Sequence, residues 1–147
     1  MLIAALAIGT ALSLGMFHLT GLSPGGIVTP GYLALVLDKP RDLAIILAAA
    51  IAAWGIVRLI GDWLMLYGAR RFGLTVLIGL CLSVAANLAA QQSIALAGDW
   101  TALGYVVPGL LAHQLDRQGF INTMLPLAIA APLARIILLA VVRWSPW

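Results

Sequence analysis

Residues 26–39 read GIVTPGYLALVLDK, and residues 104–117 read GYVVPGLLAHQLDR. The first thirteen positions of the two stretches share eight identities, and the fourteenth keeps a basic residue. Each stretch contains a Pro-Gly pair, then Leu-Ala, then Leu-Asp followed by Lys or Arg. Proline lacks a backbone N–H and restricts the residue before it, so each Pro-Gly pair predicts a helix start or a helix break.

The composition around these stretches is that of a membrane protein. The 147 residues are 63% apolar and only 9% charged, with a mean hydropathy of +1.09, which leaves too little polar surface for a soluble domain. A bilayer core requires roughly 20 apolar residues per helical span. Four segments meet this requirement, at residues 2–17, 43–60, 73–90 and 120–142.

Apolar segments flank each copy of the pattern, and this order predicts an internal repeat. We expect an all-α integral membrane protein with one transmembrane domain over residues 1–147. Its two halves, residues 1–66 and 72–143, each contain a long helix, a short helix broken at Pro-Gly, and a second long helix. Residues 61–72 link the halves, and their aromatic and Arg side chains are typical of a membrane interface.

Two membrane topologies fit the repeated element. If the short helices are re-entrant, the protein has four spans, with Lys39, Arg41 and Arg117 on one side and Arg58, Arg70, Arg71, Arg135 and Arg143 on the other. This version, which we favour, places both termini in the cytoplasm. If the short helices cross, the halves become three plus three spans of inverted orientation. In both versions the Pro30-Gly31 and Pro108-Gly109 pairs are expected to approach one another inside the protein, because non-helical backbone at membrane depth needs cover.

Motifs for independent catalysis are missing from the sequence. It contains no phosphate-binding glycine motif for a nucleotide. Its only histidines, His18 and His113, support neither a metal constellation nor a Ser-His-Asp set. We therefore expect no catalytic residues, metal site or cofactor in this chain, and no nucleic-acid partner.

Two arginines within the apolar segments are candidates for a path. Arg58 and Arg135 follow Asp38 and Asp116 at nearly equal spacing. Charges inside spans usually face a bundle interior or a water-filled path, although an arginine near a helix end also extends toward the interface. Together with Pro30, Gly31, Pro108 and Gly109 at the short-helix starts, they form a candidate path for an anion.

The acid-base pairs that end the two copies have a simpler interpretation. Asp38 precedes Lys39, and Asp116 precedes Arg117. We expect a local ion pair or helix cap at each of these positions.

Three motifs in this order resemble one known family. They are residues 20–40, TGLSPGGIVTPGYLALVLDKP, then residues 66–72, LYGARRF, and then GYVVPGLLA from residue 104, followed by Gln118-Gly119. Over essentially the whole chain the sequence resembles the CapC or PgsC subunit of poly-γ-glutamate synthases. The stretch at residues 91–101 departs from that pattern, because it is short and carries a single acid.

The resemblance implies a multi-pass subunit in the bacterial cytoplasmic membrane that belongs to a capsule-forming complex. Its implied partners are a CapB- or PgsB-like ATP-dependent amide ligase, a CapA- or PgsA-like subunit, and the polymer. In this interpretation the chain supports the ligase and helps the polymer leave, and a homo-oligomer or a shared interface forms the path.

Two alternatives stay open at this stage. The chain is a purely structural anchor that recruits the ligase through Arg70 and Arg71, or it is a stand-alone transporter for an unrelated anion.

Overall fold

The fold is all-α. The computed structural model describes residues 2–65, 67–92 and 102–144, and these residues form six helices with no strand among them. The helices are α1 (Leu2–Thr20), α2 (Thr29–Val36), α3 (Pro40–Leu64), α4 (Ala69–Gln92), α5 (Ala102–Gln118) and α6 (Phe120–Trp144). By length and composition, α1, α3, α4 and α6 are able to cross a membrane, which confirms the four apolar spans expected from the sequence.

Large apolar side chains on the outer faces of these four helices are exposed, as lipid contact requires. Examples are Ile3 on α1, Leu59 on α3, Leu77 on α4 and Ile121 on α6. The apolar core lies inside, where α2, α3, α5 and α6 meet; its fully buried members include Leu33, Ile46, Val107, Leu111 and Leu115.

The first Pro-Gly element is a helix start preceded by a buried loop. Gly25 and Gly26 have φ values of +74° and +112°, which end any helical run before α2. The hydroxyl of Ser13 donates to the Gly26 carbonyl at 3.1 Å, and that of Thr29 donates to the Gly25 carbonyl at 2.7 Å. These bonds satisfy backbone oxygens that would otherwise be buried without partners. Pro30 then lies in the first turn of α2, where its missing N–H costs nothing.

The second Pro-Gly element is not a break. Pro108 lies inside α5, which runs from Ala102 to Gln118, so the predicted break at Pro108 is wrong. The physical reason is local: where the first half has Gly25 and Gly26, the second has Leu103 and Gly104. Lacking the glycine pair with positive φ, the helix continues and gives up one backbone bond at the proline.

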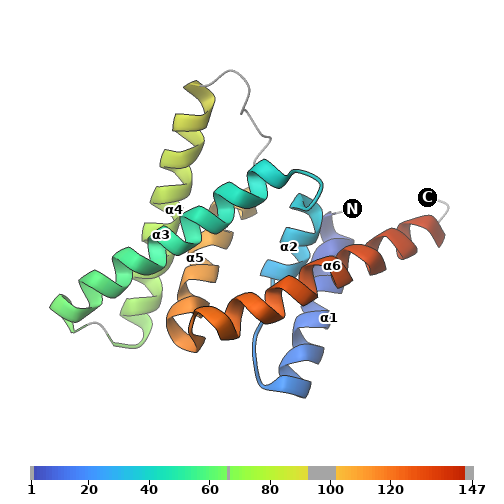
Figure 1. The fold of residues 1–147 in the computed structure, drawn as a ribbon, viewed down its shortest axis with the longest axis horizontal. Coiled ribbons are helices and arrows are strands. Elements are labelled where there is room, and N and C mark those ends of the chain that lie inside the picture. The colour runs from blue at the N-terminus through green and yellow to red at the C-terminus, as the bar shows by residue number, and fades with distance from the viewer. Residues whose placement is uncertain (1, 66, 93–101, 145–147) are drawn as a thin grey trace.

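Helices α1, α2 and α3 run opposite to α4, α5 and α6, respectively (Figure 1), whereas the internal repeat of the two halves stays a prediction. In Figure 1, α1 runs downward and α4 upward, α2 upward and α5 downward, and α3 crosses the molecule in the sense opposite to α6. The third helix of each half packs mainly on the other half: α3 lies against α4 and α5, and α6 lies against α1 and α2. The two halves are therefore interlocked.

Each half also contains a close crossing between two glycines. A Cβ added to Gly9 on α1 would collide with the Gly31 backbone on α2, and one added to Gly79 on α4 would collide with that of Gly109 on α5. Small residues let helix backbones approach each other in this way. The glycines of the two Pro-Gly pairs thus bring each short helix against the first long helix of its own half.

Candidate functional site at the end of α5

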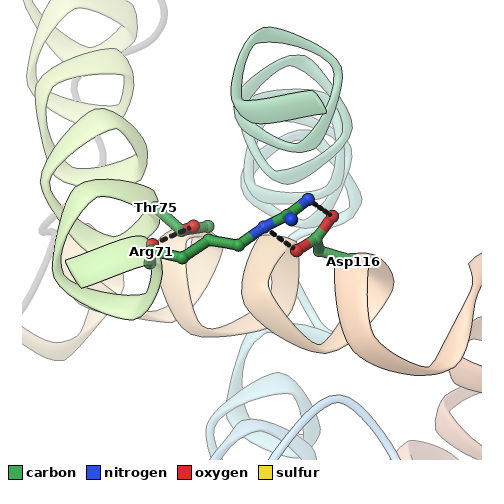
Figure 2. A network of polar contacts seen from close by, with 3 residues as sticks. All are labelled: Arg71, Thr75 and Asp116. Atoms are coloured by element: carbon green, nitrogen blue, oxygen red, sulfur yellow. Dashed lines mark hydrogen bonds and ion pairs between the residues drawn. The ribbon is translucent and has the colours of Figure 1, made fainter. Parts of the chain in front are cut away.

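An ion pair joins the start of α4 to the end of α5. Figure 2 shows the Arg71 guanidinium bonded through two nitrogens to the Asp116 carboxylate. Nε lies 2.6 Å from Oδ2, and Nη2 donates to Oδ1 at 2.7 Å. The Asp116 side chain is only 11% exposed, so this two-pronged pair is partly desolvated. Gly61 of α3 lies beside the guanidinium, since a Cβ added there would be in ordinary van der Waals contact with Arg71 Nη2 at 3.5 Å.

A cavity of about 520 Å³ opens beside this ion pair. Its wall includes Tyr67, Arg71, Phe72, His113, Asp116 and Arg117. The His113 ring packs edge-on against Phe72 at a centroid distance of 4.8 Å. Its Nδ1 is buried, and within the described part of the chain it has no hydrogen-bond partner. We call the cavity beside the Arg71–Asp116 pair the first cavity.

A second cavity of about 470 Å³ lies between the end of α1, the loop before α2, and α5. Its wall includes Ser13, Phe17, Ser23, Gln114, Arg117 and Gln118. With its carboxamide turned for bonding, Gln118 donates to the Ser23 carbonyl and accepts from the Ser23 N–H, both at 3.1 Å. Arg117 lines both cavities.

The two repeated aspartates form ion pairs with distant arginines. Asp38 pairs with Arg135 of α6, whose Nη1 also donates to the Ala34 carbonyl at 3.1 Å, and Asp116 pairs with Arg71. The expected local pairs with Lys39 and Arg117 do not form within the described residues. For Asp116 and Arg117 the reason is geometric, because neighbouring helical residues point about 100° apart and Asp116 is turned toward α4. Asp38 and Lys39 lie in the turn between α2 and α3, where Asp38 is turned toward Arg135.

The other predicted path residues lie apart from both cavities. Arg58 is exposed on α3, with its guanidinium 5.5 Å from the Trp54 ring centroid, and Arg135 is engaged with Asp38. Pro30, Gly31, Pro108 and Gly109 are buried in the two helix crossings and do not face lipid. The mutual approach of the two Pro-Gly pairs stays a prediction.

The two predicted docking arginines have different surroundings. Arg70 is exposed, whereas Arg71 is bonded to Asp116. The Arg71–Asp116 pair also places Arg71 and Arg117 at one end of the α4–α5 hairpin. Their expected placement on opposite membrane faces stays a prediction, and the return of α5 along α4 to the level where α4 begins argues against it.

Several residues of this site were not singled out from the sequence. Gln114 was not noted at all, and Gln118 was noted only as part of the family motif; their shared place on one helix face shows that both belong to the site. Gly9 and Gly79 had a detectable signal, because Ile-Gly-x-x-Leu-Ser occurs at residues 8–13 and again at 78–83. The stretch at residues 91–101 lies largely outside the described residues. No cluster of three or more metal-ligating His, Cys, Asp or Glu side chains was found among residues 2–65, 67–92 and 102–144.

Comparison with known proteins gives consistent matches. A family model described as capsule biosynthesis CapC matches residues 8–124. The capsule biosynthesis protein CapC of Bacillus anthracis is 36% identical over 126 residues, covering 85% of this chain and 81% of that protein. The PGA biosynthesis protein CapC of Bacillus subtilis (strain 168) is 32% identical over 120 residues, covering 81% of this chain and 80% of that protein. Among solved structures no significant match was found.

Proposed function

The chain belongs to the CapC family of capsule biosynthesis proteins, and from this premise we propose that it is the membrane subunit of a poly-γ-glutamate synthase and export complex. In this role it supports an ATP-dependent amide ligase at the bacterial cytoplasmic membrane and helps the polymer cross. The observation that carries the proposal is the family match over residues 8–124, on a chain with four helices able to span a bilayer. The name of the Bacillus subtilis relative supports the choice of polymer.

The physical problem for such a subunit is the charge of the polymer. Poly-γ-glutamate carries one carboxylate per residue, and transfer of an ionised carboxylate into hydrocarbon is severely unfavourable. A path therefore needs cationic or dipolar groups that bind weakly enough for release. Arg58 fits this need because it is exposed and makes no ion pair within the described residues.

A purely structural role is the competing candidate, and one observation favours it. Arg70 is exposed at the start of α4 and makes no ion pair within the described residues, so it is available to a cytoplasmic ligase. Arg71 is occupied by Asp116 and contributes to docking only by holding α4 in place. In this version the chain recruits a CapB-like subunit without contacting the polymer.

The test is reconstitution with the partner subunits. A bacterium without its own capsule genes would express the chain with CapB-like and CapA-like subunits, and polymer would be measured in the membrane fraction and in the medium. Omission of the chain is expected to abolish exported polymer. Arg58→Leu is expected to lower exported polymer while ATP-dependent synthesis in isolated membranes persists. Arg135→Leu is less informative, because it also leaves Asp38 without its partner.

The same system separates the two candidates. Arg70→Glu should abolish co-purification of the ligase if the chain is only an anchor, and Arg58→Leu should then leave export unchanged. Normal polymer output without the chain would contradict both versions.

A further inference from the structure

We propose that the end of α5 is a binding site for a carboxylate-bearing polyamide, with Arg117 as the cation that holds the carboxylate. The naming of this ligand as γ-linked polyglutamate rests on the proposed function. The site itself rests on the two cavities, on the register of α5, and on the pairing of the charges around them.

The register of α5 explains how one side chain serves two cavities. His113, Asp116 and Arg117 follow at i, i+3 and i+4, so they share one helix face, and this face lines the first cavity. Gln114, Arg117 and Gln118 repeat the same spacing one residue later and line the second cavity. Arg117 lies where the two faces meet. A chain passing over the end of α5 would therefore meet the same guanidinium from either cavity.

Of the two arginines that line the first cavity, Arg117 is the one whose charge is available to a ligand. Asp116 is engaged by Arg71, since its Oδ1 accepts from Nη2 and its Oδ2 lies in ion-pair contact with Nε. Arg117 is exposed and makes no ion pair within the described residues. The first cavity thus has an excess of one positive charge from its Arg and Asp side chains. The buried, unpartnered Nδ1 of His113 adds a second polar atom that nothing in the described fold satisfies.

The lining of the second cavity fits an amide-containing ligand. Ser13 and Ser23 lie on the wall opposite α5, and Gln114 and Gln118 lie on α5 itself. Because Gln118 is turned toward Ser23, the Gln114 carboxamide is the amide left on this wall. A carboxamide both donates and accepts, which matches the N–H and C=O of a peptide-like backbone. Phe17 and Ile27 supply apolar surface for the methylene groups of a glutamyl unit.

An anionic lipid headgroup is the competing ligand for an exposed arginine at a helix end. It would satisfy Arg117 through charge alone and would make no use of the amide wall. A polyamide uses the guanidinium and both cavities, so the observations favour it.

The experiment measures binding by the purified full-length chain in nanodiscs of phosphatidylcholine. The probe is a synthetic γ-linked oligoglutamate, followed by isothermal titration calorimetry. Arg117→Gln should weaken binding by about tenfold or more, because a charge-assisted bond is lost. Arg117→Lys should retain most of the affinity. Arg143→Gln, which removes an exposed arginine of α6 outside both cavities, should bind as the unmodified chain does. Gln114→Leu should weaken binding by a smaller factor.

Any one of three results would overturn the proposal. These are equal affinities of Arg117→Gln and the unmodified chain, equal losses in Arg117→Gln and Arg143→Gln, or, in a second set of nanodiscs that contain phosphatidylglycerol, a loss in Arg117→Gln that is absent from phosphatidylcholine alone. Circular dichroism melting of each variant keeps a folding defect from being read as lost binding, and Arg117→Lys gives a second, folded comparison. Failure of the proposed function is a separate result, because it would appear as normal capsule polymer in cells lacking the chain.

Discussion

The Arg71–Asp116 pair is the residue-scale feature with the clearest structural consequence. It connects helices whose charged residues lie 45 positions apart in sequence, and it is the only contact that fixes the end of α5 to the start of α4 through opposite charges within the described residues. Removing one partner of a mostly buried ion pair leaves the other charge poorly solvated. The pair therefore holds the wall of the first cavity in place.

We expect Arg71→Met to lower the free energy of unfolding by about 1–3 kcal/mol, a range reduced from that of fully buried pairs because Arg71 is 32% exposed. Thermal melting in detergent would measure the change. The control is Arg70→Met, which removes an exposed charge next in sequence and should stay within about 0.5 kcal/mol. Adding Asp116→Leu to Arg71→Met should recover part of the loss. Equal melting temperatures for Arg71→Met and Arg70→Met would contradict a stabilising role.

At the scale of elements, the two glycine crossings set the distances between helices. We expect Gly9→Ala and Gly79→Ala each to destabilise the fold by about 1–3 kcal/mol or more, because the new Cβ meets backbone that cannot rotate away. Gly15→Ala on α1 and Gly73→Ala on α4 are matched controls, since a Cβ there meets nothing within 4 Å. These controls should be neutral or stabilising by up to about 1 kcal/mol through helix propensity. Equal melting temperatures for all four variants would show that the helices can move apart at the two crossings without loss of stability.

The sequence was sufficient to predict the long apolar helices, but of the two Pro-Gly elements it predicted only the first correctly. The predicted spans at 43–60 and 120–142 lie within α3 and α6, because a bilayer demands continuous apolar runs that can be read directly. The start of α2 at Pro30 also followed from local rules. The continuation of α5 through Pro108 could not be predicted from local rules. One proline is compatible with a helix start, a break or a tolerated kink, and the neighbouring glycines decide among these three.

The candidate site was less accessible to such reasoning. The sequence drew attention to Asp116 and Arg117, but it assigned them to each other. Their true surroundings depend on which face of α5 meets α4, and that is fixed by the Gly79–Gly109 crossing at long range. A local pattern specifies the direction of a side chain relative to its own helix, whereas partners such as Arg71 and Arg135 follow from how helices are placed.

At the scale of the whole molecule, the packing of α3 on α4 and α5 and of α6 on α1 and α2 brings polar side chains together around the two cavities. The ends of α1 and α5, the start of α4 and the loop before α2 converge on the two cavities, and α3 crosses beside the Arg71–Asp116 pair (Figures 1 and 2). The opposite directions of corresponding helices are those of the three-plus-three topology. The re-entrant version instead requires both halves to run the same way.

This difference gives a prediction about membrane sidedness. Because α2 runs upward and α5 downward (Figure 1), Lys39 and Arg117 should face opposite sides of the membrane, whereas Arg70 and Arg117 should share a side. Single cysteines at these three positions, in a Cys81→Ser background, would be labelled with an impermeant maleimide in right-side-out and inverted vesicles. We expect Arg70→Cys and Arg117→Cys to react in the same vesicle orientation and Lys39→Cys in the other. The re-entrant topology predicts the reverse grouping, with Lys39→Cys and Arg117→Cys together, and that labelling pattern would overturn the inverted arrangement of the two halves.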